Sequence, residues 1–494
     1  MRSYFKENFY NDFLSSVVVF LVALPLCMGI ALASGVDPIV GLLSGIIGGI
    51  VVGTFAGSPL QVSGPAAGLA VMVFQFVEKY GVESLVPLGI IAGIFQIIMY
   101  RFKLAQYFRA MSPALIKGML AGIGLLILIS QMHIALLNKP GGNGLNNILE
   151  LPGIFMTNLF GSGVAQVSFG LALSVVFLIF VWQKFFPKLN KKFPAPLFAI
   201  LAASALANFA GLRIDFVKIP NDILAEIHFI SLDSFSNFSF GLVFSAIAIA
   251  FVASAESLLC VNAVDKMSGE KSDYNQEIFA QGLGNVVAGM VGALPLTGVI
   301  VRSSANLESG GKTRGAAVMH GIWLFCLVFF LPQVLELIPI AALAGILIYT
   351  GLKLLNLKAI PAMIKEDKKE ALVFLLTLGL ITTTDLLTGV IIGFVISLFV
   401  LMSEVMKLDI KQEEQEGGEL KVVMQGKATF LHIPKISKEL VRLTDLERGD
   451  VTIDLSNVAY VDNTIIQELN DWADEGSEAE KIACKRKIKY PKVL

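Results

Sequence analysis

The chain has 494 residues, of which 55% are hydrophobic and only 16% are charged, and its mean hydropathy is +0.74. Ordinary soluble domains are far more polar, so this composition indicates a polytopic α-helical membrane protein. The formal net charge is -1, and no run of Lys and Arg alternates with aromatic residues, which excludes a nucleic-acid-binding surface. The four cysteines are scattered, without the spacing of a disulfide framework or a zinc site.

Apolar stretches near the roughly 20 residues that a spanning helix needs recur along the chain. After a polar N-terminus at 1–12, we predict fourteen segments, seven in each half of a transmembrane domain at 13–406, with repeats at about 13–211 and 240–406. The first half holds 13–34, 39–56, 63–78, 85–101, 113–137, 165–185 and 195–211. The second holds 240–262, 276–293, 297–308, 315–333, 338–355, 370–385 and 388–406.

The third and tenth segments are short and rich in Gly, and each follows a lead that contains Pro. They occupy the same place in each half, and an odd number of crossings per half makes the second half enter the membrane in the opposite sense. This is the geometry of an inverted repeat. Broken helices in such transporters meet near the bilayer midplane with free N–H groups and positive dipole ends, so the pair predicts a substrate site.

Loop charge predicts the orientation. With the N-terminus in the cytoplasm, Lys and Arg gather in the cytoplasmic loops, and the opposite loops hold only Lys79, Lys139, Arg213 and Lys218. An acidic linker at 407–419 then leads to a small domain at 420–494, in which strand and helix patterns alternate. An even number of crossings places this α/β domain in the cytoplasm, on a multi-pass protein of a bacterial inner (plasma) membrane.

The start of the third segment suits an anion, because Pro favours a first helical turn and small residues let a ligand approach the backbone. These residues are Ser63, Gly64, Pro65, Ala66 and Ala67. The alternative is that small residues here only permit close helix packing.

Arg302, near the start of the tenth segment, adds a full positive charge to the dipole end. The alternative is an arginine at the cytoplasmic rim. Thr297, Val301 and Ser303 complete the predicted substrate-binding set, although hydroxyls in membrane helices also bond to their own backbone.

Glu256 is the only carboxylate inside the eighth segment, and a buried carboxylate needs a proton, a cation or an ionic partner. We predict a coupling residue that binds a proton or sodium, and the alternative is a structural ion pair with Arg302. Metalloprotease, serine hydrolase and P-loop motifs are missing, so we predict no enzyme activity, no catalytic residue, no cofactor and no other metal. The stretch GLGNVVAG at 282–289 is interpreted as helix packing.

Four stretches resemble the SulP family of inorganic anion transporters, related to the animal SLC26 proteins. They are LPLCMGIALASGVDP at 24–38, SGPAAGLAVMV at 63–73, QGLGNVVAGMVGALPLTGVIVRSSANLESGGKTR at 281–314, and DLSNVAYVDNT at 454–464, which resembles a STAS domain. The resemblance implies a seven-plus-seven fold with a core and a gate domain, elevator-like movement of the core, and a homodimer. It matches Arg302 to the family's anion site and Glu256 to its acidic position.

Three departures from the family bear on coupling, substrate and the tail. Sodium-coupled bicarbonate members have Asp and, four residues later, Thr where this chain has Glu256 and Cys260. Many relatives have Gln where this chain has Leu26, which removes a polar contact. The stretch after Trp472 is too short for the usual closing strand and helix, which predicts an abbreviated STAS-like domain.

The sequence therefore predicts a secondary active transporter of a small inorganic anion, with sulfate and bicarbonate as the leading substrates. Transport would be proton- or sodium-coupled symport or anion exchange, in a bilayer and as a homodimer. The alternatives are an anion channel of the same fold, a nucleobase permease, and a membrane sensor. Arg302 speaks against the permease, which is expected to place carboxylates in both the eighth and tenth helices. The tail has Asn463 where signalling relatives have a phosphorylatable Ser, which speaks against the sensor.

Overall fold

The computed structural model describes residues 2–489 apart from 109–111, 142–143, 191–192, 219–226, 232–238, 357–359, 406, 415–418, 446–449 and 479–485. The chain divides into two compact units, Met1–Phe394 and Val395–Leu494.

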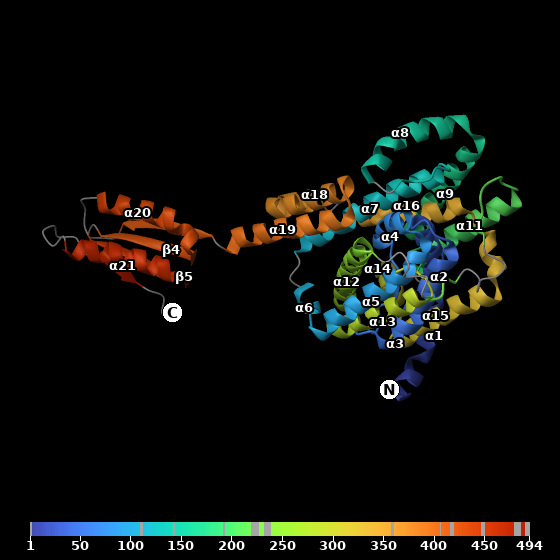
Figure 1. Ribbon diagram of the computed structural model, residues 1–494, viewed down its shortest axis with the longest axis horizontal. Helices are drawn as coiled ribbons and strands as arrows, with labels where there is room; N and C mark the ends of the chain where they lie inside the picture. The colour runs from blue at the N-terminus through green and yellow to red at the C-terminus, as the bar shows by residue number, and fades with distance from the viewer. Residues whose placement is uncertain are drawn as a thin grey trace. The chain divides into compact units, whose positions relative to one another are not determined.

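Helices form nearly all of the described part of the first unit (Figure 1). Its first half contains α1 (Arg2–Ala33), α2 (Pro38–Ile47), a π-helical turn (Gly48–Val52), α3 (Gly53–Phe55), α4 (Ala67–Tyr80), α5 (Leu85–Arg101), α6 (Ala105–Phe108), α7 (Pro113–Ala135), α8 (Gly144–Gly161), α9 (Gly163–Phe185), α10 (Pro187–Asn190) and α11 (Ala195–Phe209). Its second half contains α12 (Phe240–Ser268), α13 (Tyr274–Met290), α14 (Ile300–Glu308), α15 (Arg314–Phe330), α16 (Ile340–Leu355), α17 (Ile360–Glu366), α18 (Lys368–Thr383) and α19 (Leu386–Val405), which runs on into the second unit.

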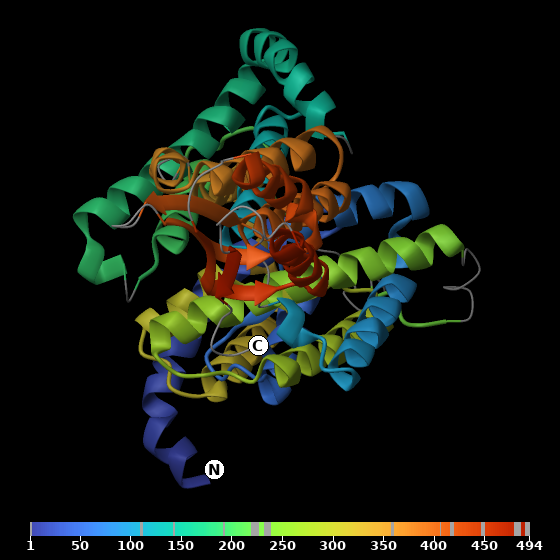
Figure 2. The ribbon, with the colours of Figure 1, turned by 90° about the vertical axis from the view of Figure 1, so that its left-hand side faces the viewer.

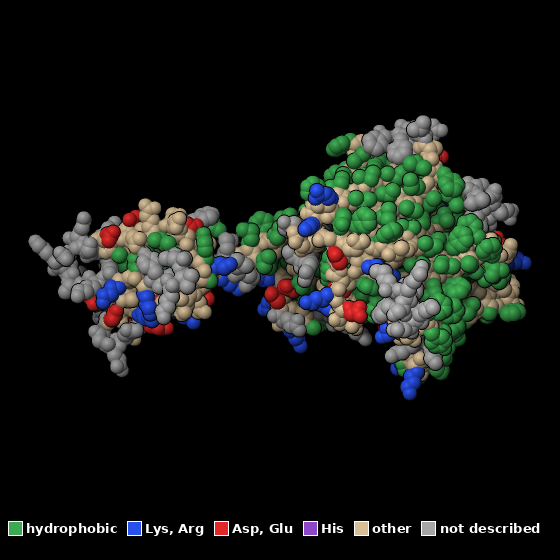
Figure 3. Space-filling view, turned by 90° about the horizontal axis from the view of Figure 1, so that it is seen from below, with side chains coloured by type: hydrophobic (Ala, Val, Ile, Leu, Met, Phe, Trp, Pro, Cys, Tyr) green, Lys and Arg blue, Asp and Glu red, His purple; other side chains and the backbone are tan. Residues whose placement is uncertain are grey.

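A helix lies in each predicted segment, and seven helices among the described residues are long and apolar enough to span a membrane. Hydrophobic side chains cover much of the face of this unit that Figure 3 shows, as a surface in contact with lipid requires. Helix α8 was not predicted. Its polar Asn and Glu residues and its internal Pro152 interrupt the apolar pattern that identifies the other helices.

The predicted starts of the third and tenth segments are wrong, because short strands precede both helices. Strand β1 (Ser63–Pro65) pairs antiparallel with β2 (Leu296–Gly298), and α4 and α14 begin only at Ala67 and Ile300. Pro65 explains why the helix cannot begin at Ser63, because a proline disfavours helical backbone at the residue before it, here Gly64. Pro65 is therefore a strand residue and not part of the first turn of a helix.

Glycine contacts bring α5 against α13, which follows it by almost 200 residues (Figures 1 and 2). A Cβ atom added to Gly89 would lie 2.6 Å from the Cα of Gly289, and one added to Gly93 would lie 2.5 Å from the carbonyl oxygen of Gly282. The interpretation of the GLGNVVAG stretch as helix packing is confirmed, since both of its terminal glycines lie in this close contact.

The second unit contains a four-stranded sheet in the order β3 (Leu408–Glu414), β4 (Leu420–Ala428), β5 (Val451–Val461) and β6 (Arg486–Lys489). Strands β3 and β4 are antiparallel, and β4, β5 and β6 are parallel. Apolar side chains of the sheet share a core with α20 (Ile433–Asp445) and α21 (Asn463–Glu478). Sequence analysis found no closing strand, but β6 pairs with β5 over four residues, so a short basic segment suffices to close this edge.

Candidate functional site

Strands β1 and β2 lead directly into the N-termini of α4 and α14 within the first unit. The N-cap residues Ala66 and Val299 make no side-chain capping bond, and the first-turn N–H groups of α4 and α14 have no acceptor within their own helices. Strand pairing continues to the start of α14, where the Val299 N–H donates to the Val62 carbonyl at 2.9 Å. Two positive dipole ends thus lie beside one small sheet, an arrangement that favours an anion.

Arg302 lies in the first turn of α14 and is fully buried. Its Nη2 contacts the Cys27 sulfur at 3.3 Å and the Pro65 carbonyl oxygen at 3.4 Å. Its Nε and Nη1 find no hydrogen-bond partner among the described residues. A guanidinium carries five N–H donors, and leaving several of them unpaired in a buried place is costly, so the missing partner is expected to be an anion.

Gly64 makes room for this guanidinium. A Cβ atom at residue 64 would lie 2.0 Å from Nη1 of Arg302, which is far inside any normal contact. The glycine is therefore needed for the position of the arginine. This is a sharper role than the backbone access expected from the sequence.

Glu256, on α12, lies beside the start of α4 and not beside Arg302. A Cβ atom at Gly68 would lie 2.7 Å and 2.8 Å from its two carboxyl oxygens, and Oε2 finds no hydrogen-bond partner among the described residues. Its carboxyl group forms no ion pair with Arg302 within 4.0 Å, so the structural ion pair considered as an alternative is absent. The positive end of α4 can compensate a negative charge here, since Gly68 lies in its first turn.

The remaining predicted site residues differ in how they contribute. Ser63 is in β1 and accepts a hydrogen bond from Gln281 Nε2 at 2.7 Å, and Thr297 is buried in β2. Ser303 accepts from the Val62 N–H and donates to the Val299 carbonyl, both at 2.9 Å, so its hydroxyl is already engaged by the backbone. The structure brings all three to the paired strands, where the hydroxyls of Ser63 and Ser303 are hydrogen-bonded to other parts of the site.

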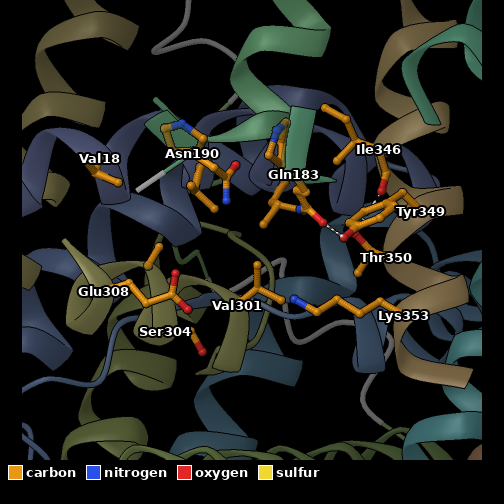
Figure 4. A pocket seen from close by; sticks show the side chains of 15 residues that line it. Val18, Gln183, Asn190, Val301, Ser304, Glu308, Ile346, Tyr349, Thr350 and Lys353 are labelled. Atoms are coloured by element: carbon orange, nitrogen blue, oxygen red, sulfur yellow. Dashed lines mark hydrogen bonds between the residues drawn. The ribbon is translucent and has the colours of Figure 1, made fainter. Parts of the chain in front are cut away.

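A cavity of about 110 Å³ opens next to this arrangement (Figure 4). Val301, Ser304 and Glu308 line one side from α14, while Gln183, Tyr349 and Lys353 line the opposite side from α9 and α16. Tyr349 donates to the Gln183 side chain at 2.7 Å, and the Lys353 side chain extends toward Val301. Val301 directly precedes Arg302 in α14, but the buried Arg302 itself does not line this cavity.

Sequence reasoning missed several residues of the site. Cys27 was treated as an ordinary buried thiol, yet its sulfur touches Arg302. Gly68, which lies against Glu256, directly follows the predicted substrate-binding residues 63–67, but its neighbour could not be predicted. Gln281 and Asn285, both buried and hydrogen-bonded to the strands, were visible as polar residues within an apolar segment.

The chain is similar in sequence and in structure to known transporters. Residues 9–377 match the model of a family described as the sulfate permease family. The putative sulfate transporter YvdB of Bacillus subtilis is 28% identical over 80% of this chain and 74% of that protein. The transmembrane domain of the cyanobacterial bicarbonate transporter BicA superposes with a TM-score of 0.67, at 22% identity, over 79% of this chain and 97% of that one. Murine Slc26a9, an anion transporter in the inward-facing state, superposes with a TM-score of 0.77 at 17% identity. The match covers 97% of this chain and 85% of that one.

Proposed function

The chain belongs to the sulfate permease family, and from that premise we propose that it is a secondary active transporter of sulfate or bicarbonate. Its relatives are transporters, so it is an anion transporter of this family and not an enzyme. The fold is that of the transmembrane domains of BicA and Slc26a9.

The observation that carries the proposal is the buried, incompletely paired Arg302 beside two helix N-termini. The anion would bind the guanidinium, for which Gly64 makes room, and the first-turn amides of α4 and α14. Ser63, Pro65, Ala66, Ala67, Thr297, Val301 and Ser303 would form or support this site. The charge of one arginine and two dipole ends suits a small inorganic anion.

Glu256 would couple this site to a cation. When ionised, its carboxylate competes with the anion for the positive end of α4 beside Gly68. A bound proton or sodium ion would remove this competition, so the cation and the anion would bind together. Coupling by anion exchange would leave Glu256 ionised and is the alternative mode.

The proposed architecture has fourteen crossings arranged as a seven-plus-seven inverted repeat of core and gate domains. The antiparallel pairing of β1 with β2 and the matching positions of α4 and α14 support this symmetry. An elevator-like movement of the core would expose the site alternately, and the protein would be a homodimer in the inner (plasma) membrane. Both the N-terminus at 1–12 and a STAS-like domain predicted at 420–494 would be cytoplasmic. Most of the predicted linker at 407–419 is not a linker, because Leu408–Glu414 forms strand β3 of the sheet of that domain.

Uptake into proteoliposomes tests the proposal. Radiolabelled sulfate and bicarbonate are supplied separately under imposed proton and sodium gradients, with the wild type and the Arg302→Ala variant. We expect gradient-driven uptake of one anion and its loss in Arg302→Ala. The matched control is Arg213→Ala, at an exposed loop arginine, which should transport normally.

Two results would contradict this reading. Unchanged uptake in Arg302→Ala would refute the anion site. Voltage-driven conductance without gradient-coupled uptake would replace the transporter with an anion channel of the same fold.

A further inference from the structure

A row of polar side chains on α13 runs beneath the two strands of the site. Glu277, Gln281 and Asn285 follow one another at intervals of four residues, and all three are fully buried. This spacing places them on one side of the helix. Polar groups are retained in such an interior only where they are hydrogen-bonded, so their partners indicate what the row does.

The first two members of the row hold the lead into β1. Glu277 accepts hydrogen bonds from the N–H groups of Gly57 and Ser58 at 2.8 and 3.0 Å, and from Gln61 Nε2 at 2.7 Å. Gln281 Nε2 donates to Glu277 Oε1 at 2.8 Å and to Ser63 Oγ at 2.7 Å. Since Ser63 is the first residue of β1, a single amide connects the anchored carboxylate to the strand that touches Arg302.

Asn285 holds β2 in the corresponding way. Its Oδ1 accepts from the Leu296 N–H at 2.7 Å, and its Nδ2 donates to the Leu296 carbonyl at 3.1 Å and to Gln96 Oε1 at 2.8 Å. Leu296 is the first residue of β2. Because the strands are antiparallel, with Ser63 opposite Gly298 and Leu296 opposite Pro65, the two contacts secure opposite ends of the sheet.

We propose that Gln281 and Asn285 are positioning residues of the anion site, which hold the first residue of each strand so that β1 and the two helix N-termini meet one ligand. The inference rests on the proposed function of Arg302. The guanidinium donates to Cys27 and Pro65 and to neither of these amides, so both act through the strands. Strands of three residues form few hydrogen bonds with each other. Their position therefore depends on hydrogen bonds from outside the sheet, such as those of Gln281 and Asn285.

The test is the concentration dependence of uptake by the full chain in proteoliposomes, using whichever of radiolabelled sulfate and bicarbonate the wild type takes up. Gln281→Met keeps the size of the side chain and removes its donor. We expect the half-saturation concentration to rise about tenfold, because small misplacements of binding groups are costly, with a maximal rate within about twofold of the wild type. The matched control is Gln131→Met on α7, at a buried Gln whose Nε2 finds no partner among the described residues, and it should leave the constant unchanged.

A double-mutant cycle shows whether Gln281 acts through Ser63. Gln281→Met should add less in a Ser63→Ala background than in the wild type, since both changes break the same contact. Fully additive effects, or an unchanged constant in Gln281→Met, would overturn the proposal. If Gln281→Met does not fold, Asn285→Asp is the second variant, which keeps the acceptor for the Leu296 N–H and loses the donor. It must raise the half-saturation concentration for uptake.

The two proposals fail in different ways. Unchanged uptake in Arg302→Ala would refute the anion site itself, and with it the positioning role. Loss of uptake in Arg302→Ala together with a normal half-saturation constant in Gln281→Met would refute the positioning role alone.

Discussion

Two buried charges in this chain are treated in opposite ways. In the second unit, Asp454 on β5 lies 2.9 Å from the Lys421 ammonium and 3.7 Å from that of Lys489, and it accepts from the Ser456 N–H at 2.9 Å. In the first unit, Arg302 is more deeply buried and leaves Nε and Nη1 without partners among the described residues. The comparison separates a charge that builds a fold, joining three strands, from a charge that lacks partners, which we propose an anion supplies.

Removing the incomplete charge should have the largest effect. Arg302→Met is expected to lower uptake by at least about 100-fold, because it deletes the main electrostatic partner of the anion. The midpoint of thermal unfolding in the absence of anion should stay the same or rise, since an unpaired buried charge destabilises the protein. A large fall in that midpoint would show that Arg302, like Asp454, is a structural charge.

Displacing the charge without removing it should cost less. Gly64→Ala places a methyl group where Nη1 of Arg302 now lies, and the flexible arginine is expected to move aside in a folded protein. The half-saturation concentration for uptake should then rise about tenfold. Gly170→Ala is the control, because a Cβ at this residue of α9 meets nothing within 4 Å. Equal behaviour of the two variants would contradict the close contact at Gly64.

Neutralising the other charge near the site should affect the driving force more than binding. Glu256→Gln is expected to abolish the stimulation of uptake by a proton or sodium gradient and to leave anion exchange largely intact. Initial rates with and without the gradient measure this difference. A variant that keeps full stimulation would exclude Glu256 from coupling.

Breaking the compensated charge should change stability but not transport. Asp454→Asn is expected to destabilise the second unit by about 1–2 kcal/mol, because it weakens the charged hydrogen bond with Lys421 and the ion pair with Lys489 on the two neighbouring strands. Hydrogen exchange of the β5 amides in the full chain measures this loss. Uptake should stay normal. Impaired uptake would show that Asp454 also affects transport, which would contradict the contrast drawn between Asp454 and Arg302.

The pH dependence of the second unit gives the smallest effect. Burial alone would raise the pKa of Asp454, but hydrogen bonds from Ser456 and the nearby Lys421 ammonium lower this pKa below its ordinary value. A carboxyl group of this kind stabilises the fold above its unfolded pKa of about 3.9, and this stability is lost as the pH falls further toward the folded pKa. Protection of β5 should thus decline below about pH 4 in the wild type, and less steeply in Asp454→Asn.

Much of the membrane unit could be predicted because its signals are local. Apolar length located the helices, and Gly and Pro located the two interruptions. The pairing of β1 with β2 could not be predicted, since three-residue strands carry no pattern of their own and their partners are distant in the sequence. The same limit applies to β6, which is short, basic and defined only by its register on β5.

Residue types at the site were easier to predict than their neighbours. A lone arginine in a Gly-rich apolar stretch is enough to suggest Arg302. Glu256 lies beside Gly68 and not beside Arg302 because of how α12 packs on α4. No local sequence pattern encodes this packing. Gln281 and Asn285 are polar residues within an apolar segment, but this Gly-rich stretch is interpreted from the sequence only as helix packing.

The paired half-helices are alike in backbone and unlike in what they offer a ligand. The third residue of α14 is Arg302, and the third residue of α4 is Leu69, so all of the formal charge comes from one partner. The other partner contributes room, through Gly64 against the guanidinium and Gly68 against the carboxyl group of Glu256. A ligand bound at these two N-termini would meet a formal charge on the α14 side and only backbone N–H groups on the α4 side. Substitutions on the α14 side should therefore weaken binding more than substitutions on the α4 side.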